Sequence, residues 1–365
     1  MALVAQIFLW ISLTTIGVQC QSLKETNLIV TTVLDVPYTM LRDTAESNLI
    51  GNDRFEGYVV DLIDTISKQL KFNYTLQINP SGMIGSVDKS GRWNGMIGEI
   101  VDGRAHIAAG SISITRNRES AVDFTVPFMN LGIGVIVKTE IYEKSALDDF
   151  VDIFYPFSRH YSTVTFFLLT LIFGIILLVL RRKYKTAIFR ILLGIWFLFL
   201  FMFTSLYISQ LASNYNSNYY KVEAFRTFEE LASQDHVVYG CIKGGSTEAF
   251  LRDSKHPLYR KMWSRMVEME PTPFVLTNME GIERVRQGNY AFISESSIIE
   301  YATSRHCDLH QIGDLITSKG YGLAVQQGSP LRESLSYAIL QLQEDGTLSL
   351  LKNKWWNELN GGGTC

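Results

Sequence analysis

Two stretches of the chain combine residue types that can bind an anion. The first, Gly244-Gly245-Ser246-Thr247-Glu248, places two glycines and two hydroxyls where a strand gives way to a helix. Free backbone N–H groups, hydroxyl donors and the positive end of a helix together form a receptor for a carboxylate or phosphate. The alternative interpretation is an ordinary helix N-cap, and residue types alone leave both open.

The second stretch runs from Ser111 to Arg118 and follows the apolar segment 105–109. Its hydroxyls alternate at Ser111, Ser113 and Thr115, and Arg118 could clamp a carboxylate with two parallel hydrogen bonds. An arginine in such a place is otherwise a solvated surface group. The sequence therefore offers a carboxylate clamp at Arg118 as a hypothesis.

Catalytic chemistry and nucleic-acid binding have little support. The six histidines show no metal-ligand spacing, and neither a Gly-x-Ser-x-Gly motif nor a P-loop occurs. The chain has 33 Lys plus Arg against 36 Asp plus Glu, a formal net charge of −3, whereas nucleic-acid binding needs a basic field. We expect a binding protein, not an enzyme, with no metal, no cofactor and no nucleic-acid partner.

The elements that must position these residues alternate between strands and helices in two outer blocks, 23–145 and 222–365. The expected strands are 28–34, 72–78, 105–109, 132–138, 237–242, 290–294 and 322–325. The expected helices are 57–70, 94–101, one that opens at 247–252, 256–269 and 331–342. This alternation predicts an α/β fold with mostly parallel sheets, in which ligands gather at strand carboxyl ends and helix N-termini.

Two apolar segments separate the blocks. Residues 163–180 and 191–211 carry no charge, and each is long enough to cross a bilayer. The intervening loop, 181–190, contains five Lys or Arg residues and no acid, so the positive-inside rule assigns it to the cytosol. We expect two transmembrane helices with both outer blocks outside the cell.

Three further features bear on location. Residues 1–20 are almost uncharged and predict a signal peptide, the alternative being a first transmembrane helix. Asn73 begins a glycosylation sequon in the first block, which supports an exterior position weakly. Beyond residue 20 the cysteines are Cys241, Cys307 and Cys365, and in an oxidising compartment two of the three would pair.

Five motifs resemble those of ionotropic glutamate receptors, most closely the AMPA and kainate subunits, and they occur in the family's order across both blocks. They are EGYVVDL (56–62), WNGMIGE (93–99), DFTVPFM (123–129), SKGYG (318–322) and LKNKWW (351–356). The resemblance implies a two-lobed clamshell, like a periplasmic binding protein, interrupted by the two transmembrane α-helices. The ligand it implies is L-glutamate or a related α-amino acid.

Roles at the α-amino-acid end follow from the same resemblance. Arg118 would hold the ligand α-carboxylate, and Glu295 would pair with the α-ammonium. Ser113 stands where the family usually has threonine and keeps the hydroxyl. Ser111 replaces a proline whose carbonyl accepts from the ammonium, a contact that the backbone can still make.

The resemblance also implies roles elsewhere in the chain. Ser246 and Thr247 would take the distal carboxylate, and Asp35 and Asn278 sit where the family has a polar lock between the lobes. Its disulfide would join Cys307 to Cys365 and leave Cys241 unpaired. The aromatic side chain that normally covers the ligand is replaced by Ile84, so its stacking contribution is lost.

Two functional hypotheses remain. The first is a subunit of a ligand-gated cation channel, a homo- or hetero-tetramer with other receptor subunits in the plasma membrane, including postsynaptic membranes. The second is a membrane-anchored amino-acid receptor or modulatory subunit that does not conduct by itself. The resemblance favours the first as the role of the chain, whereas the length of the loop favours the second, because ten residues, 181–190, cannot hold a pore helix and its return strand. From the resemblance we also expect that this sequence has no counterpart of the family's large N-terminal domain and last transmembrane helix.

Overall fold

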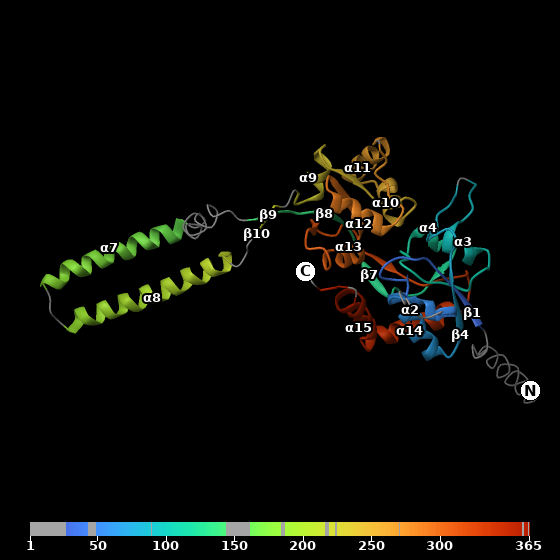
Figure 1. The fold of residues 1–365 in the computed structure, drawn as a ribbon, viewed down its shortest axis with the longest axis horizontal. Helices are drawn as coiled ribbons and strands as arrows, with labels where there is room; N and C mark the ends of the chain where they lie inside the picture. The colour runs from blue at the N-terminus through green and yellow to red at the C-terminus, as the bar shows by residue number, and fades with distance from the viewer. Residues whose placement is uncertain are drawn as a thin grey trace, which may run out of the picture. The chain divides into compact units, whose positions relative to one another are not determined.

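The structure is a computed structural model that describes residues 27–42, 49–88, 90–143, 161–183, 187–215, 219–222, 225–269, 271–359, 361–363 and 365. The expected signal peptide, 1–20, lies outside these residues, as does the middle of the basic loop, 184–186. The chain divides into two compact units. The larger unit combines the residues up to Lys138 with Phe225–Cys365, and the other is Thr139–Ala224 (Figure 1).

A five-stranded sheet forms the first lobe of the larger unit. β1 (Asn27–Thr32) runs parallel to its neighbours β4 (Asn73–Ile78) and β5 (Ile107–Ala108). Beyond β5, β15 (Ala324–Val325) runs antiparallel to β5, and β6 (Asp123–Phe124) pairs antiparallel with β15 at the edge.

Helices cover both faces of this sheet. Successive side chains point to opposite faces of a strand, and here Ile107 joins one buried apolar cluster while Ala108 joins another. The helices and short helical turns of the first lobe are η2 (Gly51–Arg54), α2 (Tyr58–Leu70), α3 (Gly95–Val101), α4 (Arg116–Glu119), α14 (Leu331–Glu344), α15 (Thr347–Asn353) and η3 (Lys354–Glu358). A short hairpin joins β2 (Met40–Leu41) to β3 (Phe55–Glu56).

A four-stranded sheet forms the second lobe, in the order β11 (Val238–Gly240), β12 (Tyr290–Glu295), β8 (Ile133–Lys138), β13 (Leu309–Ile312). Only β11 and β12 are parallel. The helices of this lobe are α9 (Phe228–Ser233), α10 (Ser246–Asp253), α11 (Pro257–Glu268), α12 (Asn278–Gln287) and α13 (Ser296–Thr303).

The expectation of mostly parallel sheets is wrong, because two strands change lobes. β8 belongs to the first block of sequence but lies in the second sheet, and β15 belongs to the second block but lies in the first sheet. Each runs antiparallel to the strands beside it. A third crossing pairs β7 (Met129–Leu131) with β14 (Lys319–Tyr321). The individual helices and strands expected in the two blocks are present, with bounds that differ by a few residues.

The helix α2 shows how local sequence produces these elements. Its apolar residues recur at helical spacing, and Leu62, Ile63 and Ile66 are all fully buried, while the helix contacts α14 and α15. It begins after Gly57, whose backbone φ of 135° and close approach to the Tyr38 carbonyl oxygen exclude a side chain. It ends at Leu70, and the C-cap residue Lys71 adopts the left-handed conformation.

The described residues of the smaller unit form two helices and a two-stranded ribbon. β9 (Glu140–Glu143) pairs antiparallel with β10 (Tyr219–Val222). The apolar segments 163–180 and 191–211 fall within α7 (Tyr161–Lys183) and α8 (Ala187–Tyr215). Within the described ranges, no helix meets the combined length and hydropathy of a membrane span.

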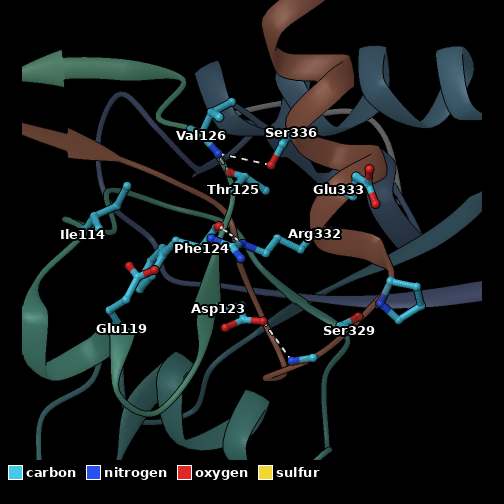
Figure 2. A pocket seen from close by; sticks show the side chains of 12 residues that line it. Ile114, Glu119, Asp123, Phe124, Thr125, Val126, Ser329, Arg332, Glu333 and Ser336 are labelled. Atoms are coloured by element: carbon cyan, nitrogen blue, oxygen red, sulfur yellow. Dashed lines mark hydrogen bonds between the residues drawn. The ribbon is translucent and has the colours of Figure 1, made fainter.

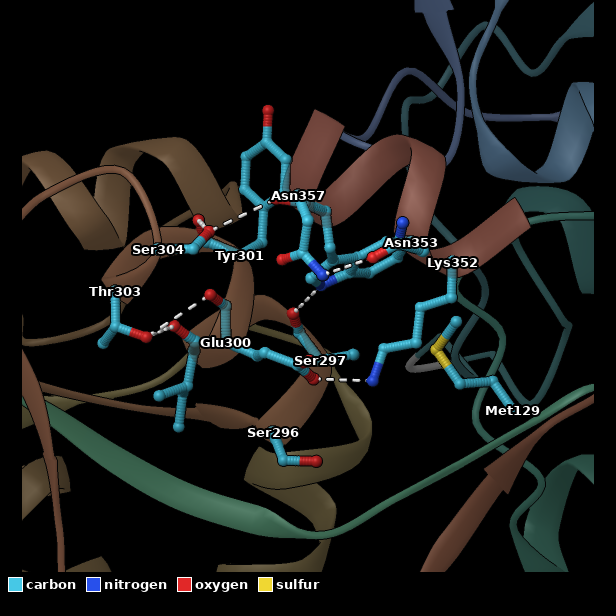
Figure 3. A network of polar contacts seen from close by, with 12 residues as sticks. Met129, Ser296, Ser297, Glu300, Tyr301, Thr303, Ser304, Lys352, Asn353 and Asn357 are labelled. Atoms are coloured by element: carbon cyan, nitrogen blue, oxygen red, sulfur yellow. Dashed lines mark hydrogen bonds and ion pairs between the residues drawn. The ribbon is translucent and has the colours of Figure 1, made fainter. Parts of the chain in front are cut away.

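The C-terminal part of the larger unit is bonded to α13 by a network of polar contacts (Figure 3). Lys352 forms an ion pair with Glu300 at 2.7 Å, and the Trp356 indole donates to the Ser297 carbonyl at 2.8 Å. The buried Trp356 ring also packs edge-on against Tyr38 and Tyr58. This network fixes the start of α13, which immediately follows Glu295.

Candidate functional site

Arg118 is a buried guanidinium held by backbone carbonyls. It lies in α4, whose N-cap Thr115 accepts a hydrogen bond from the Arg118 N–H, and the residue is only 4% exposed. Nη1 donates to the Ser113 carbonyl at 2.9 Å, while Nε and Nη2 donate to the Gly85 carbonyl at 3.4 and 3.3 Å. Among the described residues, no carboxylate lies within ion-pair distance of it. The solvated-surface interpretation of Arg118 is therefore wrong.

Burial lowers the pKa of Arg118 to about 10, an effect that the nearby Glu295 carboxylate partly offsets. The guanidinium nevertheless remains charged at neutral pH. A buried positive charge bonded only to carbonyl dipoles is poorly compensated and favours an anionic partner. Arg118 is thus arranged to receive a carboxylate.

Glu295 lies at the end of β12 and accepts hydrogen bonds from both lobes. Its Oε1 accepts from Ser113 Oγ of the first lobe and, at 2.6 Å, from Ser246 Oγ of the second. The two serine hydroxyls are themselves 3.0 Å apart. Oε2 accepts from the hydroxyl of Tyr321. The predicted residues Ser113, Ser246 and Glu295 therefore form one network between the lobes.

Tyr321 and Lys319 are site residues that the sequence analysis did not identify. Burial and the adjacent Glu295 carboxylate raise the pKa of Tyr321 well above its ordinary value, so its hydroxyl stays a donor. Lys319 Nζ donates to the Ser246 carbonyl at 3.4 Å, and burial lowers its pKa. Both belong to the motif 318–322, which contributes to the family resemblance but from which no ligand-binding residue was predicted.

Asp35 and Asn278 meet directly across the lobes. The Asn278 amide, at the start of α12, donates to Asp35 Oδ1 at 3.0 Å, and Ser111 Oγ donates to Oδ2 at 2.6 Å. Ser294 Oγ in turn donates to Asn278 Oδ1 at 3.3 Å. Burial is the main cause of the raised pKa of Asp35, although the bonds from Ser111 and Asn278 lower it. The polar contact that the resemblance implied is present.

The N-terminus of α10 is already capped by a carboxylate of its own helix. Glu248, at the third position, accepts from the Gly244 N–H and lies 3.6 Å from Arg252. Thr247 is buried directly after Ser246. The sequence suggested an open anion receptor at this place, and the role of Glu248 in its own cap was not anticipated.

Two small cavities lie where these groups converge. One, of about 140 Å³, is lined by Arg118, Ser246 and Glu248, with Trp93 at its wall. The other, of about 90 Å³, is lined by Asp35, Ser111, Asn278 and Ile84. The two cavities share Gly85, Ser86, Gly244 and Gly245 in their walls. Ile84 therefore lies on the Asp35 side of the site. Of the residues predicted for ligand binding, Arg118 and Ser246 line the first cavity and Ser111 lines the second. The others, Ser113, Thr247 and Glu295, line neither but are neighbours or hydrogen-bond partners of Ser246.

A wider hollow of about 740 Å³ lies on the first lobe, between β6 and the start of α14 (Figure 2). Glu119 faces it, whereas its neighbour Arg118 faces the 140 Å³ cavity. Its polar groups bond to one another: Arg332 donates to the Phe124 carbonyl at 2.9 Å, and the Ser336 hydroxyl accepts from the Val126 N–H at 3.2 Å. The convergent charges thus favour the smaller cavities as the amino-acid site.

The cysteines and the glycosylation residue lie away from these cavities. Cys307 and Cys365 form a disulfide with their Cα atoms 5.2 Å apart, and Cys241 is a free, buried thiol whose pKa is raised by burial. Asn73 is exposed at the start of β4. In the part of the chain that the structure describes, no group of three or more His, Cys, Asp or Glu side chains could hold a metal ion.

Comparison with known proteins agrees with this geometry. Residues 26–141 match the family described as ligated ion channel L-glutamate- and glycine-binding site. The chain is 32% identical over 384 residues to glutamate receptor ionotropic, kainate 4 of Mus musculus, covering 94% of this chain and 40% of that protein. It is 36% identical over 378 residues to glutamate receptor ionotropic, kainate 1 of Homo sapiens, covering 92% and 40%. It thus spans about 40% of the length of these relatives, which are receptor subunits and not enzymes.

Proposed function

The chain belongs to the ionotropic glutamate receptor family, and we propose that its larger unit binds L-glutamate or a closely related α-amino acid as the ligand-binding part of a receptor subunit. The observation that carries this proposal is the buried, carbonyl-bonded guanidinium of Arg118 at the wall of a cavity between the lobes. An α-carboxylate placed there forms two charge-assisted hydrogen bonds in a desolvated setting. It also compensates a charge that the fold has already buried.

The α-ammonium group is assigned to Glu295. This carboxylate already accepts from Ser113, Ser246 and Tyr321, so it is oriented before a ligand arrives. An ammonium group can share the carboxylate with these donors and also donate to the Ser111 carbonyl. Arg118 and Glu295 then recognise the two charges that all α-amino acids have in common.

The side-chain end of the ligand is assigned to the start of α10, where Ser246 and Thr247 supply N–H groups and hydroxyls. The bond between Asp35 and Asn278 lies beside this region and links the lobes. A ligand that contacts both lobes stabilises their approach by its differential affinity for the closed arrangement. The paired segments β7 and β14, which lead into the crossing strands β8 and β15, provide the covalent connection about which the lobes move.

We also propose that α7 and α8 anchor the chain in the plasma membrane, with the basic segment 181–190 in the cytosol and both blocks outside. The subunit would assemble as a homo- or hetero-tetramer with other receptor subunits, including those of postsynaptic membranes. The alternative role, a modulatory subunit that does not conduct by itself, is supported by the helix bounds. α7 ends at Lys183 and α8 begins at Ala187, which leaves no length for a pore loop between them.

Equilibrium binding tests the ligand assignment. Membranes from cells that express the full chain are incubated with radiolabelled L-glutamate, and unlabelled α-amino acids compete. We expect saturable binding that L-amino acids displace and that the corresponding amines, which lack the α-carboxylate, do not. Displacement by an amine at the same concentration as its amino acid would contradict the role of Arg118.

A further inference from the structure

Three helices of the second lobe begin with the same carboxylate cap. In α9, α10 and α12, a glutamate at the third helical position accepts a hydrogen bond from the backbone N–H four residues before it. The pairs are Arg226 N–H to Glu230 at 2.7 Å, Gly244 N–H to Glu248, and Leu276 N–H to Glu280 at 2.7 Å. In each case the donor is the residue that precedes the N-cap, so the carboxylate fixes the chain where it enters the helix.

The cap of α10 differs from the other two in its surroundings. α9 and α12 are also capped by threonine hydroxyls, whereas the N-cap of α10 is Gly245, which has no side chain. Glu248 lines the 140 Å³ cavity together with Arg118, while Glu230 and Glu280 do not. The Glu248 side chain is 16% exposed. It is therefore a capping carboxylate that also forms part of the candidate ligand site.

The charge of Glu248 is only partly compensated. Arg252 lies 3.6 Å from it but is also 3.0 Å from Asp253, and its side chain is 46% exposed. The guanidinium of Arg252, which also lines the cavity, is therefore shared between two carboxylates and screened by solvent, so it compensates only part of the Glu248 charge. Arg118, which lines the same cavity, is the group assigned to the α-carboxylate.

We propose that Glu248 determines side-chain specificity at this site by lowering the affinity for L-glutamate relative to L-glutamine. The inference rests on the proposed function, because it assumes that Arg118 and Glu295 hold the α-carboxylate and α-ammonium groups. A second carboxylate on the ligand, placed at the Ser246 and Thr247 N–H groups, would be repelled by the Glu248 carboxylate, which accepts from the nearby Gly244 N–H. The amide of glutamine instead donates a hydrogen bond to Glu248.

The test compares the dissociation constants of radiolabelled L-glutamate and L-glutamine on membranes that carry the full chain. In Glu248→Gln the side chain can still accept from the Gly244 N–H but has no charge. We expect this variant to raise the affinity for glutamate relative to glutamine by about tenfold or more, the size expected when two carboxylates no longer share one site. Glu248→Ala should change the ratio in the same direction.

Glu230→Gln is the matched control, since Glu230 makes the same cap in α9 outside the cavity. It should leave the ratio unchanged, and surface labelling of each variant establishes equal delivery. An unchanged ratio in both Glu248 variants, or an equal change in Glu230→Gln, would overturn the inference. The proposed function fails separately, and the inference with it, if neither amino acid binds the wild-type chain.

Discussion

The hydroxyl of Tyr321 donates a hydrogen bond to Oε2 of Glu295. Tyr321 is the last residue of β14, in one of the segments that join the lobes, and it is fully buried against Tyr38, with the two ring centroids 5.5 Å apart. Glu295 is the last residue of β12 in the second lobe. The bond therefore couples the carboxylate assigned to the ligand ammonium to the aromatic core behind the site.

Replacing Tyr321 by Phe should weaken amino-acid binding several-fold, because one oxygen of Glu295 loses the donor that orients it. The ring is retained, so the loss in unfolding free energy should be about 1–2 kcal/mol. Tyr290→Phe is the control: its buried hydroxyl donates to the Pro273 carbonyl at 2.6 Å, away from both cavities. Saturation binding and thermal unfolding of both variants separate the effect on ligand affinity from the effect on stability. Equal losses of affinity in the two variants would contradict a role for Tyr321 in the site.

Replacing Arg118 by Ala should reduce the affinity for L-glutamate by roughly thirty-fold to several-hundred-fold, about 2–4 kcal/mol. The reason is that a desolvated ligand carboxylate would be left without its partner. Arg116→Ala removes an exposed arginine from the same helical turn and should leave affinity unchanged. Calorimetry on the purified full chain is the measurement, and unchanged glutamate affinity in Arg118→Ala would refute the assignment.

The pH dependence of stability should report Asp35. Because its pKa is raised in the folded chain, the folded state holds the proton more tightly than the unfolded state. Its contribution to stability is then fully present below the unfolded pKa, near 4, and is lost as pH rises through the folded pKa. Asp35→Asn removes this titration, so its melting temperature should rise relative to wild type as the pH increases from 4 to 7.

Asp345→Asn serves as a comparison, because the stability contributed by Asp345 should change with pH in the opposite direction. Hydrogen bonds from Thr347 lower the pKa of this exposed carboxyl, so its contribution is lost as pH falls. The variant should therefore approach wild-type stability as the pH is lowered. Thermal unfolding of the detergent-solubilised chain, monitored by tryptophan fluorescence at each pH, gives the melting temperatures of both variants. If the difference in melting temperature between Asp35→Asn and wild type does not change with pH, Asp35 does not titrate as described.

Local patterns predicted the elements of the larger unit well but not how strands combine. The spacing of Val60, Ile63, Ile66 and Leu70 predicts one apolar helix face, and α2 forms there with the first three buried and Leu70 partly buried. Strand direction depends on partners far away in sequence. Val135 pairs with Ile293 and Ala324 pairs with Ala108, contacts that no local period encodes. The expectation of parallel sheets failed for this reason.

The same distinction applies to the candidate site: local sequence identified some of its residues, but their roles depend on distant contacts. The contact of Asp35 with Asn278, 243 positions apart, came from the family resemblance and not from either residue's neighbours. Glu248 and Tyr321 were both within quoted motifs, yet their roles depend on the carboxylate or N–H group that tertiary structure brings to them. An acidic residue three positions after a helix N-cap is a recognised capping signal, and it could have identified Glu248.

Removal of the disulfide should destabilise the larger unit. Cys307 and Cys365 are separated by 58 positions, for which the loop-entropy model gives roughly 4 kcal/mol. Cys307→Ser should therefore lower the melting temperature, and the double variant Cys307→Ser with Cys365→Ser should be no less stable than the single one. A non-reduced peptide map must show Cys307 linked to Cys365. A peptide that joins Cys241 to either of them would contradict this pairing.

Expressed alone, the chain should give no glutamate-gated current even where it binds ligand. Closing the lobes can act on α7 and α8 only through the connecting segments, and these are present on both sides. Ion selectivity, however, requires backbone carbonyls or polar side chains along a narrow re-entrant segment. Only three positions separate Lys183, the end of α7, from Ala187, the start of α8, so no segment between them can enter a membrane and return.

The helices themselves offer no substitute filter. Residues 191–211 carry no charge and are rich in phenylalanine, so a bundle of α8 helices would present an apolar axis that stays dry. Whole-cell recording with surface delivery confirmed by labelling is the measurement, first with the chain alone and then with a conducting kainate subunit. A reproducible glutamate-evoked current from the chain alone would refute the prediction. A current that appears only with the partner, and that Arg118→Ala in this chain alters, would assign it the ligand-sensing role, because the partner then supplies the filter.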